Sequence, residues 1–323
     1  MAERSTAPRV VREVLAKMAA SDTVTAESLV GLQRSLTGQA FRPSRYGGSE
    51  QDADEFVSQI CELAALDGSL GWLAATFNAA AIHVATLPDD VVHAIWGTDS
   101  DAVVTIALHG SGAVDPDGRL TGTWESVVGA EYADWLVLPT DHAASRVLVP
   151  CSAADIEPTK EPSCLGAAGL SDVAVAGYPV DDSYAFTSNQ CAAAIAMAGA
   201  AAAVIGSADG VWRRHVEKMR ARLATSYSGD ELAIAAPAQV GRAACDIDAT
   251  KLQIIDALRR PNAEASSSWE YEQAIARARG VADRLLQNSR HALDLNDPAT
   301  RRWRDVHAGC RLAADFLRQS MVA

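Results

Sequence analysis

Cysteine pairs, basic charge and long hydrophobic runs are all scarce in this chain of 323 residues, and each absence excludes a class of protein. The six cysteines are scattered and form no CxxC pair, which argues against a disulfide framework or a zinc site and favours reduced thiols in the cytoplasm. Lys and Arg number 28 against 41 Asp and Glu, so the formal net charge is −13. An acidic surface repels phosphate backbones, and we therefore expect no nucleic-acid partner.

No apolar stretch reaches the length of a membrane span without small or polar interruptions. The most apolar segment, residues 191–205, is rich in alanine, which favours helices and lets neighbouring helices approach closely. The N-terminal region is polar and lacks the apolar core of a signal peptide. The pattern predicts a cytoplasmic protein with no membrane partner. The basic cluster at residues 213–222 is interpreted as a solvated helix face.

Hydrophobic residues make up 49% of the chain, enough for a substantial core spread over two or three structural units. Helical periodicity predicts helices at residues 9–20, 26–36, 52–66, 68–87 and 88–96. Short segments rich in β-branched and aromatic residues follow at 103–108, 119–127, 134–139, 146–150 and 172–180, which predicts a small antiparallel barrel or sandwich. Helical patterns return at 190–226, 234–260, 264–291 and 298–320.

Five sequence segments, in a fixed order, resemble one known superfamily. They are RYGG at 45–48, DGSLGW at 67–72, LPDDVVHAIWG at 87–97, LTGTWESVVGAEYADWLVL at 120–138 and RRWRDVHAG at 301–309. The superfamily is that of the acyl-CoA dehydrogenases, and the resemblance is closest to its two-component, flavin-dependent monooxygenase (hydroxylase) branch. It implies an α+β fold with an N-terminal helical domain (1–100), a middle β domain (101–187) and a C-terminal four-helix bundle (188–323). Members usually assemble as tetramers through the bundle, so a homo- or hetero-oligomer (dimer or tetramer) is expected.

The resemblance also implies a flavin, FAD or FMN, bound weakly or supplied in its reduced form by a separate reductase. The strand that carries Trp124 and Ser126 would face the flavin ring, where an indole can shield the ring and a hydroxyl can bond its polar edge. Backbone groups from Thr105 through Ala107 to Leu108 would face the pyrimidine side. The alternative is that Trp124 is a core aromatic and Ser126 an ordinary strand residue.

Several positions that carry chemistry in the relatives are apolar here. Ala80, Ala107 and Leu312 match a histidine, a serine and a second histidine of the monooxygenases. The catalytic glutamate of many dehydrogenases matches Ala313 or a neighbour. The segment at 286–298, which usually binds cofactor phosphates through glycines, contains none, although its Arg290 and His291 could compensate.

Two polar residues remain as catalytic candidates. His109 follows the first predicted strand and could act as an acid or base, or could be an exposed loop residue. Asn78 could donate a hydrogen bond to a ligand, or could be satisfied inside its helix. His307 lies off the helix face that Leu312 shares, and His83 and His93 are interpreted as packing or surface residues.

Three functions fit this pattern. The first is a flavin-dependent monooxygenase acting with O2 on a small apolar or aromatic substrate, and we favour it because the cofactor carries the difficult chemistry. The second is an acyl-CoA dehydrogenase-type desaturase that needs a partner subunit to supply the base. The third is a noncatalytic scaffold or ligand-binding relative with a degenerate site.

Overall fold

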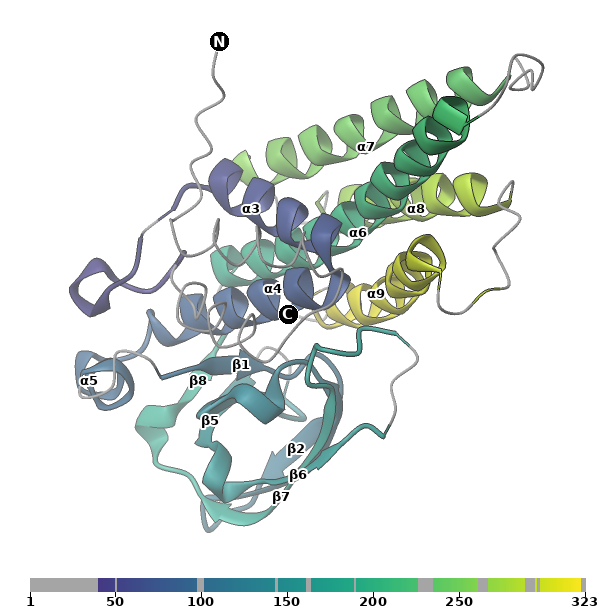
Figure 1. The fold of residues 1–323 in the computed structure, drawn as a ribbon. Coiled ribbons are helices and arrows are strands. Elements are labelled where there is room, and N and C mark those ends of the chain that lie inside the picture. The colour runs from purple at the N-terminus through teal and green to yellow at the C-terminus, as the bar shows by residue number, and fades with distance from the viewer. Residues whose placement is uncertain are drawn as a thin grey trace.

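A computed structural model describes residues 40–49, 51–97, 102–142, 145–160, 164–188, 190–225, 235–260, 267–287, 294 and 297–320. The predicted helices at 9–20 and 26–36, together with Arg290 and His291, lie outside these residues. The described elements form a group of helices stacked on a smaller β region, with α4 (Gly68–Val84) lying between the two (Figure 1). The division into three domains stays a prediction.

The first described helices begin at side-chain caps, as their sequences indicate. A short 3₁₀ turn, η1 (Ser44–Tyr46), precedes α3 (Ala53–Leu66), and Asp52 caps α3 by accepting a hydrogen bond from the Glu55 N–H at 2.9 Å. Asp67 caps α4 in the same way through the Ser69 N–H, also at 2.9 Å. α5 (Asp89–Trp96) follows Pro88. The predicted bounds of α3 (52–66) and of α5 (88–96) are therefore each confirmed to within one residue.

The β region contains two four-stranded sheets. One has the order β1-β4-β5-β8 and the other the order β2-β3-β7-β6. Their strands are β1 (Val104–Ile106), β2 (Ser111–Val114), β3 (Arg119–Val127), β4 (Trp135–Pro139), β5 (Ser145–Pro150), β6 (Asp155–Pro158), β7 (Ser171–Pro179) and β8 (Ala185–Thr187). Four 3₁₀ turns punctuate the described chain, including η4 (Asp182–Tyr184) before β8.

The expectation of a purely antiparallel region is wrong in one place. β1 pairs with β4 in parallel, with Val104 opposite Trp135 and Ile106 opposite Val137. The remaining strand pairs are antiparallel. A parallel pair needs a long connection, and here β2 and β3 form a hairpin of the second sheet within it.

Four long helices follow the β region: α6 (Gln190–Thr225), α7 (Ala235–Arg259), α8 (Ser267–Gln287) and α9 (Pro298–Ser320). They gather on the side of the molecule opposite the β region (Figure 1). α6 is the central one, since α3, α4, α7, α8 and α9 all pack against it. Among the described helices, α6 alone is long and apolar enough to cross a membrane, but 78% of its apolar window is buried inside the protein.

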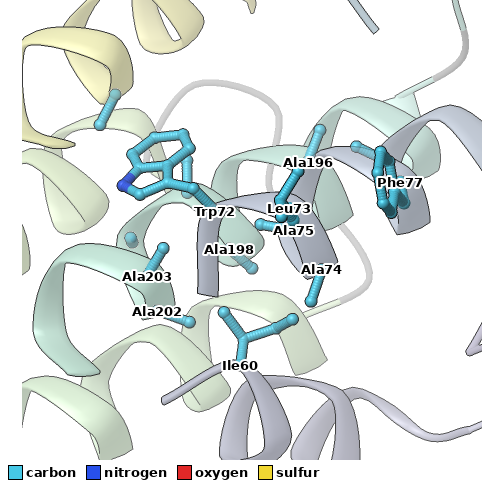
Figure 2. Close-up of a cluster of buried hydrophobic side chains, with 14 of the residues drawn as sticks. Ile60, Trp72, Leu73, Ala74, Ala75, Phe77, Ala196, Ala198, Ala202 and Ala203 are labelled. Carbon is cyan, nitrogen blue, oxygen red and sulfur yellow. The ribbon is translucent and has the colours of Figure 1, made fainter. Parts of the chain in front are cut away.

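The sheet β1-β4-β5-β8, called the first sheet below, divides the hydrophobic core into two clusters. A large cluster joins the helices to one face of that sheet, and a smaller one fills the space between the two sheets. The alanine-rich part of α6 packs against α3 and α4, and Ala198, Ala202 and Ala203 cluster with Trp72 and Ile60 (Figure 2). This confirms that residues 191–205 form a helix packed closely among helices.

The basic cluster at 213–222 is more than a solvated face. Arg213 donates to both Glu62 carboxylate oxygens, at 3.0 and 2.8 Å, and to Asp209 at 2.8 Å. Lys218 pairs with Asp297, which also caps α9 through the Ala299 and Thr300 N–H groups. Two of these partners, Glu62 and Asp297, are distant in the sequence, which is why the sequence indicated only a solvated face.

Candidate functional site

The strand expected to face a flavin, β3, carries a bulge. Its register with β7 shifts between Trp124 and Val127, so Glu125 and Ser126 have no partner residue on β7. Ser126 has φ = 52°, a left-handed conformation that is rare outside glycine, and its N–H donates to Asp172 Oδ1 at 2.8 Å. Both Glu125 and Ser126 are exposed. Bulges and strained residues of this kind are enriched next to functional sites.

Trp124 lies on the inner side of the same strand. It is fully buried in the cluster between the sheets, and its indole N–H donates to the Pro139 carbonyl at 2.9 Å. Gly110 and Gly112 leave room for this ring, because a Cβ on Gly112 would come within 2.7 Å of Trp124 Cζ2. The indole supports the bulge from inside, and direct stacking on a flavin stays a prediction that its burial does not favour.

The other expected backbone contacts are also enclosed. The Thr105 hydroxyl donates to the Val128 carbonyl at 2.6 Å, and the Ala107 N–H donates to the Val137 carbonyl at 3.0 Å. Thr105, Ala107 and Leu108 are 0%, 1% and 3% exposed. Of the five residues expected at the cofactor, the structure therefore exposes Ser126 alone.

The two catalytic candidates are not brought together. Asn78 is buried in α4, where its Oδ1 accepts from the Ala40 N–H at 3.0 Å and its Nδ2 donates to the Ala74 carbonyl at 2.8 Å. The first bond ties α4 to the preceding segment and the second lies within α4, so Asn78 is satisfied by backbone groups, which is the structural alternative raised from the sequence. His109 is exposed in the bend after β1.

The apolar replacements lie in different parts of the core. Ala80 belongs to the large helical cluster, whereas Ala107 belongs to the cluster between the sheets. Ala313 is fully buried, and Leu312 packs at the edge of the helical cluster. These positions therefore contribute close packing and offer no proton donor or acceptor of their own.

Two buried carboxyl groups, those of Asp67 and Asp305, were not predicted from the sequence as a functional element. Asp305 of α9 accepts a hydrogen bond from the Leu165 N–H at 2.7 Å and lies against the start of α4, where a Cβ on Gly68 would come within 2.8 Å of Asp305 Cβ. Burial, and then the charge of Asp67, raises the pKa of Asp305 to about 7. The segment at 301–309 entered the sequence analysis only as a family resemblance, and nothing in it indicated a carboxyl group that titrates near neutral pH.

A second cluster joins α8 and α9. Asp283 Oδ1 accepts from Trp303 Nε1 at 2.7 Å and lies 2.8 Å from His307 Nε2. Burial acts to raise the pKa of Asp283, but the hydrogen bonds from His307 and Trp303 outweigh it and lower that pKa. His307 is thus a contact between helices, in agreement with its helical phase. No group of three His, Cys, Asp or Glu side chains that could hold a metal occurs within the described residues.

The bulge offers exposed groups that can form hydrogen bonds, and a flavin contact there stays a prediction. Glu125 and Ser126 have backbone groups outside the β ladder, and the Ser126 hydroxyl is exposed beside them. Such groups suit the polar edge of a flavin ring, which needs hydrogen-bond donors and acceptors. The carboxylate of Asp172 at the same place suits the ring better than it suits a phosphate.

Comparisons with known proteins also concern the expected flavin. No family model matches the chain. The oxygenase subunit HsaA of a flavin-dependent monooxygenase from Rhodococcus jostii is 25% identical, over 88% of this chain and 86% of its own length. The oxygenase component of an FADH2-dependent resorcinol hydroxylase from a Rhizobium species is also 25% identical, over 83% of this chain and 78% of its own length.

Solved structures show the same fold. The 3-HSA hydroxylase from a Rhodococcus species superposes with a TM-score of 0.80 at 21% identity, covering 93% of this chain and 88% of that one. XiaF from a Streptomyces species, solved with FADH2 and glycerol, gives a TM-score of 0.78 at 18% identity, covering 96% and 91%. These relatives confirm the resemblance to the acyl-CoA dehydrogenase superfamily and to its flavin-dependent monooxygenase branch.

Proposed function

We propose that this protein is the oxygenase component of a two-component flavin-dependent monooxygenase that acts on a small apolar or aromatic substrate. The observation that carries the proposal is the set of flavin-dependent monooxygenase subunits that align with most of the chain. Its partners would be a flavin reductase and a small-molecule substrate, and its location the cytoplasm. Reduced flavin supplies the two electrons with which one atom of O2 enters the substrate and the other leaves as water.

The chain's own residues would bind and orient the flavin and the substrate, and they would exclude water from both. The exposed Ser126 hydroxyl, with the backbone groups of Glu125 and Ser126 that the bulge leaves outside the ladder with β7, would hold the polar edge of the ring, while the Ser126 N–H stays bonded to Asp172. Trp124 would fix the bulge through its bond to Pro139, and Asp172 through its bond to the Ser126 N–H. The closely packed helical core, with Ala80 in place of a histidine, would keep water away from the substrate side.

One observation favours a second candidate, a noncatalytic ligand-binding relative. Ala80, Ala107 and Leu312 supply no group that can transfer a proton, and the polar atoms of Asn78 are engaged by Ala40 and Ala74. A desaturase is disfavoured because fully buried Ala313 stands where many dehydrogenases carry the base. The two remaining candidates differ in whether O2 is consumed productively.

The test is an anaerobic titration of the purified protein with reduced FAD and reduced FMN, followed by oxygen uptake with a flavin reductase and NADH. We expect one reduced flavin to bind. Ser126→Asp should weaken that binding by about tenfold, because it adds negative charge at the ring's polar edge. Thr187→Asp, an exposed strand position on β8, is the matched control and should leave binding unchanged. Wild-type protein that binds neither reduced flavin contradicts the proposal, and binding without any substrate-dependent oxygen uptake favours the noncatalytic candidate.

A further inference from the structure

Three side chains from different elements meet between α4 and the first sheet. Arg146 of β5 is the register partner of Phe186 of β8, so the two side chains stand on the same face of that sheet. Neighbouring Leu148 belongs to the helical core, whereas Val147 packs between the sheets, and strand alternation therefore turns Arg146 toward the helices. His83 of α4 faces the same place, with its ring centroid 5.9 Å from that of Phe186.

Arg146 is a partly buried cation with no counter-charge among the residues that the structure describes. Its hydrogen bond runs from Nη1 to the Ser145 carbonyl at 3.0 Å, and its Nε is buried without a partner. No carboxylate of the described chain pairs with it, and burial lowers its pKa. By contrast, Arg213 and Arg259 each bind a carboxylate. Because removing a guanidinium from water is costly unless it is paired, a group that supplies negative charge here would stabilise the site.

His83 adds a neutral polar ring to this cation. It is 2% exposed, and burial followed by the nearby charge of Arg146 lowers its pKa to about 4, so the imidazole is uncharged at neutral pH. In the part of the chain that the structure describes, its ring nitrogens have no hydrogen-bond partner. The three residues together carry one positive charge, one unused imidazole and one aromatic face.

We propose that His83, Arg146 and Phe186 form a binding site for the carboxylate of a small organic acid with an apolar or aromatic body. Since Nη1 is engaged by Ser145, the Nε–Nη2 edge of Arg146 remains, and this edge matches the two oxygens of a carboxylate. His83 can donate a further hydrogen bond from its neutral ring. The single charge of Arg146 balances a monoanion, whereas a phosphate dianion would leave one charge uncompensated, and Phe186 offers an apolar wall for the body of the acid.

The site can be tested without flavin, so its outcome is independent of the proposed function. Binding of acetate, benzoate and phenylacetate to the full chain would be measured by calorimetry beside that of phenylacetamide, which has the same shape as phenylacetate but no charge. We expect at least one acid to bind about tenfold more tightly than the amide, and Arg146→Met to remove that advantage while leaving amide binding unchanged. Arg119→Met, which removes an exposed arginine bonded to the Gly177 carbonyl, is the matched control and should keep the preference.

Two further measurements separate ligand binding from folding. Arg146→Lys keeps the charge and should retain a reduced preference for the acid, and the circular dichroism of each variant should match that of the wild type. In ¹⁵N spectra of labelled histidines, the bound acid should raise the pKa of His83 from about 4, because a negative charge favours its protonated form. The proposal is overturned if no acid binds better than phenylacetamide, if Arg146→Met binds acids as the wild type does, or if inorganic phosphate competes as well as the acids do.

Discussion

At the scale of single residues, Asp305 shows how strongly the fold controls a charge. It is buried beside a second buried carboxyl group, Asp67, whose pKa is also raised, chiefly by burial. The Leu165 N–H and the positive charges of Arg302 and Arg304 offset this only in part. Asp305 therefore holds a proton at pH values where an exposed aspartate has lost it, and it does so where α4, α9 and the segment at Leu165 meet.

Stability should consequently fall as the pH rises through neutrality. The folded-state pKa of Asp305, about 7, lies above its unfolded value, so the contribution to stability is complete below about pH 4 and is lost as the pH rises through 7. The full effect is a few kcal/mol at most. Urea unfolding of the wild type between pH 4 and pH 8 should show the decline, and Asp305→Asn, which can still accept the Leu165 N–H, should flatten it.

Asp181→Asn provides the control for that experiment. Asp181 is exposed, and its pKa is lowered by hydrogen bonds from the Ser183 N–H and hydroxyl. A lowered pKa contributes stability that disappears only as the pH falls below the usual range of aspartate. The variant should therefore keep the wild-type decline between pH 4 and pH 8. An unchanged decline in Asp305→Asn would show that another group is responsible.

The fates of the predicted site residues follow from contacts that span the sequence. Asn78 was predicted on a helix, but its bond to the Ala40 N–H depends on a segment 38 residues away. Trp124 was expected near a flavin because of its motif, but it shares the buried face of β3 with Leu120, and its indole bonds to the Pro139 carbonyl across the space between the sheets. Arg146 and His83 carry no motif, so their juxtaposition could not be inferred before the sheet and α4 were placed together.

At the scale of elements, the contact between α3 and α6 depends on small residues. A Cβ on Gly206 of α6 would come within 2.3 Å of the Cys61 carbonyl oxygen of α3, and one on Gly210 within 2.6 Å of the Ala65 carbonyl oxygen. The Cys61 thiol donates to the Ala202 carbonyl at 3.5 Å across the same contact. Backbone lies against backbone, so neither helix can give way by moving a side chain.

Gly206→Ala should therefore destabilise the protein by about 1–3 kcal/mol, the usual cost of an overpacked contact, despite the better helix propensity of alanine. Gly241 of α7 is the matched control, because it is helical and exposed and its added Cβ would meet no atom within 4 Å. Gly241→Ala should raise stability by up to about 1 kcal/mol. Thermal and urea unfolding of both variants would check the pair, and equal effects would contradict the close contact.

The sequence predicted long elements better than short ones, for a physical reason. Periodicity over several turns, with caps such as Asp52 and boundaries such as Pro298, predicted α3, α5 and α6–α9 within a few residues at each end. The strands β2, β6 and β8 contain only three or four residues, too few for an alternating pattern. The parallel pairing of β1 with β4 is a tertiary choice that no local pattern records.

At the scale of the whole molecule, an ion-pair network around the buried carboxylate of Asp209 links three of the described helices. Asp209 of α6 accepts from Arg213 at 2.8 Å and from Lys251 of α7 at 3.2 Å, and Arg213 continues to Glu62 of α3. The side chain of Asp209 is 7% exposed, so its ion pairs are partly shielded from salt. This network links α3, α6 and α7 and leaves the exposed faces of α7 and α8 to other contacts.

Those exposed faces of α7 and α8 carry apolar side chains that a single chain does not cover. Leu252 of α7 is 68% exposed and Trp269 of α8 is 49% exposed, which is unusual for large hydrophobic residues. Two helices that offer such residues to solvent are typical of an interface, and the sequence predicted an oligomer that forms through the bundle.

We expect Leu252→Glu combined with Trp269→Glu to shift the protein from an oligomer to a smaller species, because each substitution would place a charge in an apolar interface. Light scattering after size-exclusion chromatography gives the mass directly, and circular dichroism confirms that the helices remain. Val114→Glu on β2, where the valine is 42% exposed, is the control and should leave the mass unchanged. If the double variant keeps the wild-type mass, α7 and α8 do not form the interface; if the wild type is already monomeric, the apolar residues have another purpose and the expectation of an oligomer is wrong.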